Sequence, residues 1–235
     1  GTPVFFRTGF LNHNLMLGHF AFMGFMAMWN YSGSVGWSSR TRFFLGGVTG
    51  GIAVLFDYSG AVLLLGLFAY GLVKGMQEAS LRDAVRHGLW YVLGTLGPVG
   101  VLWLYQWRSF GNPFLPGQHW MPPVEWIEVG YQGYGWPQME LFIALLFDYR
   151  FGLFVSCPLM LFALASPFFE RGSSRSLLRL ELAFCLALFL ALVIFFSGSS
   201  YTRLQFNTGI RYLAPIFPFL FLPAAVVLKR MPRPA

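Results

Sequence analysis

Two arginines near the end of the chain have a spacing suited to binding an anion. Arg203 and Arg211 flank the stretch LQFNTGI, and Tyr212 follows directly before a long apolar run. A guanidinium stays charged and presents a fork of N–H donors that matches phosphate oxygens. Two other roles are open for these side chains: snorkelling toward lipid headgroups, and ion pairing with Asp148 or Asp57. The residue types therefore indicate a phosphate or headgroup contact as one of three possible roles.

Two more polar positions lie at the ends of apolar runs. His13, within LNHN, could contact a ligand or form a hydrogen bond at the start of a helix. Asp57 and Tyr58, within FDYSGA, stand between two apolar runs. Asp57 either borders a polar site or is the N-cap of the next helix, and the two roles are compatible. The histidines show neither HExxH nor i,i+4 spacing, so the sequence does not predict a metal site.

Composition defines the class of protein that carries these residues. Hydrophobic residues make up 56% of the 235 residues and charged residues 11%, against about 25% charged in a soluble domain. The net charge of +7 does not indicate a nucleic-acid partner, because the basic residues form short clusters between apolar runs. The sequence therefore predicts an all-α polytopic protein whose first partner is a lipid bilayer.

Seven apolar runs are candidates for crossing a membrane, which takes about 20 residues each. They are residues 14–31, 43–56, 61–75, 88–106, 152–169, 180–198 and 212–228. The second and third runs are short, so they form either two half-length crossings or one bent hairpin. The stretch GGVTGG in the second run has the small-residue spacing that lets membrane helices approach closely.

Basic residues alternate between the loops in a way that predicts orientation. Most follow the first, third, fifth and seventh runs. Because cytoplasmic loops are enriched in Lys and Arg, this face is predicted to be cytoplasmic. Arg203 and Arg211 then lie at the extracytoplasmic face.

The longest loop on the extracytoplasmic face is predicted at residues 107–139. Gly, Pro and Trp dominate it, which indicates a structured loop with many turns. The following stretch, MELFIALLFDYRFG, has helical spacing but is too short to span, so residues 107–151 are predicted to end in an interfacial helix. The aromatic residues of the loop either stack on a sugar or form an interfacial belt. They are Trp120, Trp126, Tyr131, Tyr134 and Trp136.

Four stretches together resemble the C-terminal portion of GT-C-fold membrane glycosyltransferases, the protein O-mannosyltransferase-like group. They begin GTPVFFRTGFLNHN, FFLGGVTGGIAVLFDYSG, GYGWPQMELFIALLFDYRFG and GIRYLAPIFPFLFLP, and they occur in the family's order. The resemblance implies a transmembrane domain over residues 1–235 that is part of a longer chain, with the catalytic acid upstream of residue 1.

The resemblance also implies an activity. Such an enzyme moves a sugar from a polyprenyl-phosphate carrier to an acceptor protein or glycolipid on the extracytoplasmic face of the bacterial inner membrane. Arg211, Tyr212, His13 and Asp57 are the positions to which family site roles carry over. A carboxylate would deprotonate the acceptor, and arginine or a divalent metal would stabilise the leaving phosphate. The alternative function is a non-catalytic membrane scaffold or lipid-binding subunit.

Overall fold

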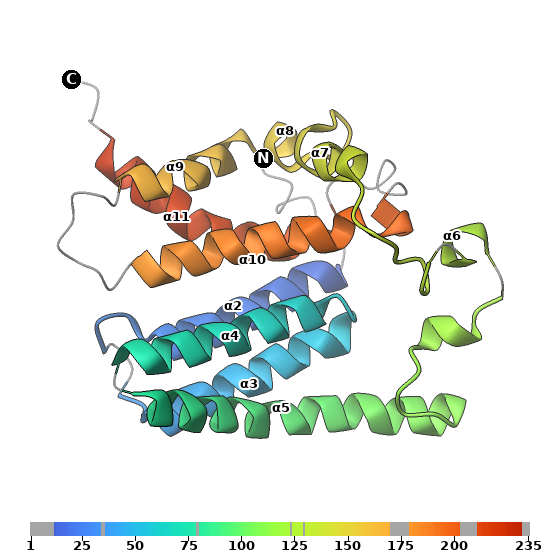
Figure 1. Ribbon diagram of the computed structural model, residues 1–235, viewed down its shortest axis with the longest axis horizontal. Helices are drawn as coiled ribbons and strands as arrows, with labels where there is room; N and C mark the ends of the chain where they lie inside the picture. Colours follow the sequence, from blue (N-terminus) through green and yellow to red (C-terminus); the bar gives the residue numbers. More distant parts are fainter. Residues whose placement is uncertain are drawn as a thin grey trace. The chain divides into compact units, whose positions relative to one another are not determined.

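The computed structural model describes a helical protein (Figure 1). It describes residues 12–33, 36–78, 80–122, 124–128, 130–169, 179–202 and 211–231. Within these ranges every regular element is a helix, and an isolated β-bridge joins Tyr134 and Ser199. The all-α prediction is thereby confirmed. The chain divides into two compact units, Gly1–Leu15 with Tyr134–Ala235, and Met16–Gly133.

Four long helices build the second unit. They are α2 (His13–Trp29), α3 (Ser39–Phe56), α4 (Gly60–Glu78) and α5 (Leu81–Phe110). The first three residues of α2 belong to the other unit. α3 packs against both α4 and α5, as the parallel ribbons in Figure 1 show.

Glycines bring the backbones of α3 and α5 into direct contact. A Cβ atom added at Gly47 would overlap the carbonyl of Tyr91, and one added at Gly94 would overlap the carbonyl of Phe44. At Gly51 an added Cβ would lie 3.0 Å from the Cβ of Pro98. The packing role predicted for GGVTGG is confirmed, since an added Cβ would overlap backbone at Gly47 and crowd Pro98 at Gly51.

The α3–α4 pair is a hairpin of two full helices. α3 has 18 residues and α4 has 19, or about 27 and 28 Å at 1.5 Å per residue. The alternative of a half-length crossing is wrong for α4, which is long and apolar enough to cross a membrane, and stays a prediction for α3. Both helices are longer than their apolar runs because polar residues continue them, beginning at Ser39 and ending at Glu78.

α5 is also longer than its apolar run of 88–106, because both of its ends are capped. The Ser80 hydroxyl accepts a hydrogen bond from the Asp83 amide (3.2 Å) and donates one to its carboxylate (2.8 Å). Gly111 ends the helix in the left-handed region, with φ 74°. The loop predicted to begin at residue 107 therefore begins at Gly111. It contains two short helices, η2 (Gly117–Trp120) and α6 (Glu125–Glu128), which confirms that the loop is structured.

The first unit is built around α10 (Arg179–Ser197). α11 (Phe217–Arg230) packs against α9 (Leu161–Phe169) and α10, and α7 (Met139–Phe147) packs against α10. The core of the unit includes Phe196, Phe219, Leu192 and other fully buried side chains.

Prolines interrupt two of the predicted runs in this unit. The run 152–169 is broken into α8 (Leu153–Ser156), η3 (Pro158–Met160) and α9, because a residue before proline avoids the helical region. Cys157 accordingly has φ −144° and ψ 77°. The last run forms the 3-10 turn η6 (Ala214–Ile216) before α11, so its α-helix begins at Phe217 and not at residue 212.

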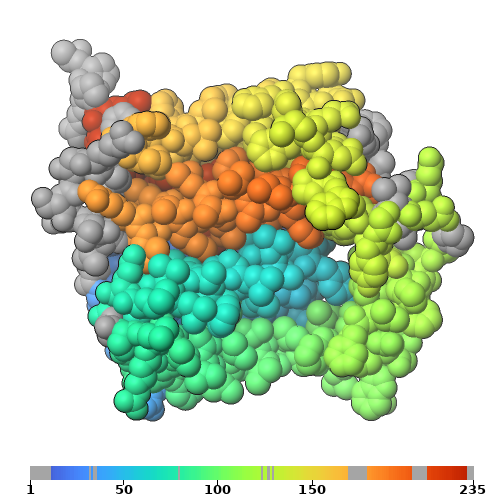
Figure 2. Space-filling model, in the orientation of Figure 1, coloured from blue at the N-terminus to red at the C-terminus, as the bar shows by residue number. Residues whose placement is uncertain are grey.

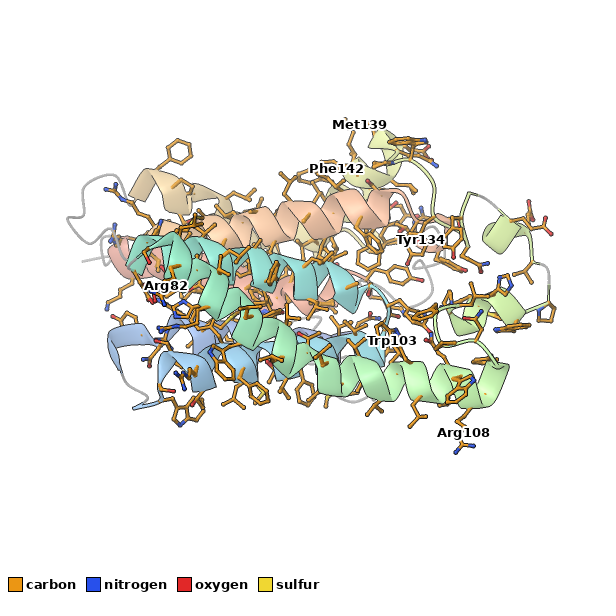
Figure 3. All side chains as sticks on the ribbon, turned by 60° about the horizontal axis from the view of Figure 1, so that its bottom comes forward. Arg82, Trp103, Arg108, Tyr134, Met139 and Phe142 are labelled. Carbon is orange, nitrogen blue, oxygen red and sulfur yellow. The ribbon has the colours of Figure 1, made fainter. Side chains whose placement is uncertain are left out.

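Three of the described helices are long and apolar enough to cross a membrane: α4, α5 and α10. Arg82 and Arg108 lie near opposite ends of α5 (Figure 3), with an apolar stretch between them. Helices occupy all seven predicted runs, while the crossing by the other four runs stays a prediction.

Candidate functional site

The end of α10 and the loop before α7 are held together by backbone hydrogen bonds. The Gln138 amide donates to the Ser197 carbonyl (3.0 Å), and the Gly135 amide donates to the Gly198 carbonyl (2.8 Å). The last carbonyls of a helix lack partners within it, so this loop satisfies groups that would otherwise need water. The Thr202 hydroxyl donates to the Phe196 carbonyl (2.6 Å) and fixes the chain as it leaves α10.

Aromatic rings gather at this end of α10. The Phe195 ring lies 4.9 Å from that of Tyr134, and the Phe196 ring lies 5.1 Å from that of Tyr212 with the planes 24° apart. Tyr201 completes the group, 6.2 Å from Tyr134. Burial raises the pKa of the Tyr201 phenol, which is therefore neutral at physiological pH. We call these five rings and Arg211 the α10-end cluster.

Arg211 gives the α10-end cluster its charge. Its guanidinium carbon lies 5.4 Å from the ring centre of Tyr212 and thus over a ring that itself stacks on buried Phe196. A cation over an aromatic face uses the π-surface of the guanidinium, while its N–H groups point outward in the plane. The stacked rings of Tyr212 and Phe196 restrict the positions that the Arg211 guanidinium can take. This arrangement suits a phosphate that approaches the edge of the guanidinium.

Of the alternatives open for Arg211, an ion pair with Asp148 is not formed. Asp148 instead pairs with Arg150, whose backbone amide, Nε and Nη2 donate to its carboxylate at 2.7, 3.1 and 3.0 Å. These hydrogen bonds hold the pKa of Asp148 below its usual range. Arg150 is only two residues from Asp148 in the chain, which favours this ion pair. The role of Asp148 is therefore to hold the turn after α7.

The start of α2 is capped by Asn12. Its backbone carbonyl accepts from the Leu15 amide (3.0 Å) and its side chain accepts from the Asn14 amide (2.9 Å). His13 is the first helical residue and is half-buried, and its predicted ligand contact stays a prediction. Sequence reasoning missed Asn14, which is fully buried with both polar atoms of its amide unpartnered. The polar stretch LNHN directly before an apolar helix is the sequence feature that could have drawn attention to Asn14.

Asp57 and Tyr58 lie in the second unit. Asp57 is the C-cap of α3, and its carboxylate accepts from the Ser59 amide (2.8 Å). The N-cap alternative for Asp57 is wrong, because α4 begins three residues later at Gly60. The Tyr58 hydroxyl accepts from Gln106 Nε2 (2.7 Å) and from the Gly117 amide (3.4 Å). Tyr58 therefore joins the α3–α4 turn, α5 and the loop.

The predicted sugar-contacting aromatics are divided between the two units. Tyr134 belongs to the α10-end cluster, whereas Trp120 lies in the second unit with its ring parallel to that of Phe110, 6.2 Å away. Tyr131 and Trp136 are 70% and 90% exposed, so sugar stacking and an interfacial belt both remain open for them. The Trp126 side chain lies outside the described part of the structure.

Arg203, the other arginine predicted to contact phosphate, lies outside the described residues. Within the described ranges no group of three or more His, Cys, Asp or Glu side chains is arranged to hold a metal ion.

Fold and composition together place the chain among helical membrane proteins, with three helices able to cross a bilayer and an aromatic, arginine-bearing cluster at the end of one of them. No protein-family model, curated protein or solved structure matches the chain.

Proposed function

We propose that the chain is the carrier-binding part of a membrane glycosyltransferase, and that the α10-end cluster binds the phosphate of a polyprenyl-phosphate-linked sugar. The observation that carries the proposal is Arg211 stacked over Tyr212 at the end of a helix long and apolar enough to cross a membrane. A lipid phosphate lies at the level where such a helix leaves the hydrocarbon core.

Binding a phosphate calls for a fixed cation close to an apolar surface. Arg211 supplies the cation, and the rings of Tyr212 and Phe196 orient it. Hydrogen bonds between an ionised donor and a phosphate are about twice as strong as those between neutral groups. Orientation by stacked rings lowers the conformational entropy that Arg211 would lose on binding.

The polyprenyl chain requires an apolar path along the bundle. Leu190 and Ile194 lie one turn apart on α10, just before the α10-end cluster, and both side chains are exposed. Because they share a helical face, they form a continuous apolar strip that leads away from Phe195. A carrier with its phosphate at Arg211 could lay its first isoprene units along this strip.

The reaction requires the carrier phosphate to leave. An acceptor hydroxyl oxygen forms a bond to the anomeric carbon of the sugar while the bond from that carbon to the phosphate oxygen breaks. The phosphate takes the electron pair, and the hydroxyl proton passes to a carboxylate acting as general base. Arg211 would stabilise the charge that develops on the phosphate. The chain's own contribution is therefore to bind the donor and stabilise the leaving group.

The proposal is tested by carrier binding in nanodiscs. Polyprenyl phosphate is the probe, and polyprenol, which lacks the phosphate, is its control. Arg211→Ala should weaken polyprenyl-phosphate binding about 10- to 100-fold, because a hydrogen bond to a charged group contributes about 1.5–3 kcal/mol. Arg211→Lys should recover part of the affinity, and neither substitution should affect polyprenol.

The matched control is Arg150→Ala, which removes an exposed arginine of the same unit that pairs with Asp148. Equal affinity of the wild type and Arg211→Ala for polyprenyl phosphate would remove the α10-end cluster from the carrier site. Wild-type binding of the carrier without transfer of its sugar to an acceptor would instead support a lipid-binding subunit.

A further inference from the structure

α7 exposes an apolar stripe on one face. Met139, Ile143 and Phe147 recur every four residues and are between 52% and 71% exposed. Met139 projects on the side of α7 away from α10 (Figure 3). The opposite face holds Leu141 and Leu145, which are buried. The helix is therefore apolar on both faces, and the fold covers only one of them.

Exposed aromatic residues stand at both ends of this stripe. Trp136 precedes α7 and Tyr149 follows it, and Tyr149 is 82% exposed. Rings of this type, with an apolar body and a polar tip, concentrate where hydrocarbon meets water. The Asp148–Arg150 ion pair lies beside Tyr149 at the end of the helix, where charged groups can meet headgroups or water.

The position of α7 selects a lipid leaflet as the partner of the stripe. Nine residues span about 14 Å, which is less than half of a ~30 Å hydrocarbon core, so α7 cannot cross it. α7 packs on α10, a helix able to cross, and the Gln138–Ser197 hydrogen bond fixes its start at the last residue of α10. α7 thus begins where a spanning helix ends. Figure 2 shows α7, in yellow, at the surface.

We infer that α7 lies in the plane of the membrane surface, with Met139, Ile143 and Phe147 immersed in the acyl chains of one leaflet and Trp136 and Tyr149 at the headgroup level. Because α7 and the α10-end cluster are both joined to the last turn of α10, the immersed helix sets the depth of the cluster. Arg211 is thereby held at the level of lipid phosphates. The inference goes beyond the proposed function, since it holds whether or not a carrier is bound.

The test is a depth measurement on spin-labelled protein in phosphatidylcholine nanodiscs. Met139→Cys, Ile143→Cys and Phe147→Cys are made one at a time, with the buried Cys157 and Cys185 replaced by alanine. Glu128→Cys, an exposed position in α6, is the water-facing control. Accessibility of each nitroxide is measured to oxygen, which partitions into lipid, and to a nickel chelate, which stays in water. Thermal unfolding of each variant checks that the fold is retained.

Nitroxides on the stripe should have an oxygen-to-nickel accessibility ratio several-fold higher than at Glu128. Nickel accessibility equal to that at Glu128 would show that the stripe faces water and would overturn the inference. Low accessibility to both reagents would show that protein covers the stripe, which would also overturn it. The oxygen-to-nickel accessibility ratios do not depend on whether Arg211→Ala weakens carrier binding. The position of α7 in the membrane and the carrier site are therefore tested separately.

Discussion

Arg211 owes its proposed role to its surroundings more than to its charge. The chain contains 16 Lys and Arg residues, and several of them serve the fold. Arg42, for example, is buried and donates to the carbonyls of Ala27 and Met28 at the end of α2. Arg42 also lies over a neighbouring ring, that of Phe43. Arg211 differs in where its ring lies, because Tyr212 stacks on Phe196 in the last turn of α10, a helix long and apolar enough to cross a membrane. Position in the sequence alone could not distinguish an arginine that stabilises the fold from one proposed to bind phosphate.

Asp148 makes the turn after α7 dependent on pH. Its pKa is lowered in the folded chain, mainly by the hydrogen bonds from Arg150, so the stabilising contribution is present above the ordinary pKa of about 4 and is lost as pH falls through the lowered value. A nitroxide at Tyr149→Cys should therefore become more mobile as the pH falls below about 4.

The control for this titration is Asp148→Asn, which removes the charge. In that background the nitroxide should be mobile at every pH. Unchanged mobility of the Asp148 protein down to pH 2, with the fold intact, would show that the ion pair does not hold the turn.

At the scale of elements, the α3–α5 contact is the most sensitive to added volume. Gly47→Ala places a methyl group against the Tyr91 carbonyl and should destabilise the fold by about 1–3 kcal/mol. Gly97→Ala on α5 is the matched control, since an added Cβ there has no atom within 4 Å. That substitution should stabilise by about 0.5–1 kcal/mol through helix propensity. Thermal unfolding in detergent measures both, and a loss no larger for Gly47→Ala than for Gly97→Ala would contradict the close contact.

Tyr58 joins the loop after α5 to α5 itself and to the α3–α4 turn. Tyr58→Phe leaves the buried Gln106 amide without its acceptor, which costs about 1–3 kcal/mol, and releases the Gly117 amide. Limited proteolysis should therefore cut the loop between Gly111 and Met121 faster in this variant. Tyr105→Phe, at an exposed tyrosine of α5, should behave as the wild type. Equal cleavage rates in all three proteins would show that Tyr58 does not hold the loop.

At the scale of the whole molecule, the sequence predicted where the helices lie better than where they end. Runs of apolar residues located every long helix, because burial and membrane contact both require them. The ends depend on local capping, such as Ser80 and Gly111 on α5, which hydropathy does not register. The break at Cys157 could have been predicted from Pro158, whose effect on the preceding residue is local.

The candidate site was predictable only in part. Arg211 and Tyr212 stood out as a polar pair before an apolar run, and in the structure Arg211 lies over the Tyr212 ring, which stacks on Phe196. That Tyr134 would join them through Phe195 was not predictable, because some 60 residues separate the two rings in the chain and the contact depends on backbone pairing near Gly198. Asp57 and Tyr58 fell in the other unit, where they hold a turn and a loop.

Photoaffinity mapping tests the central claim most directly. A polyprenyl phosphate with a photoreactive group in its first isoprene unit is cross-linked to the protein in nanodiscs, and the labelled peptides are identified by mass spectrometry. The account predicts labels on the exposed strip of Leu190 and Ile194 and near Arg211, and their loss on competition with unlabelled polyprenyl phosphate but not with polyprenol. Competable labelling confined to residues of the second unit, or labelling that polyprenol displaces equally well, would contradict it.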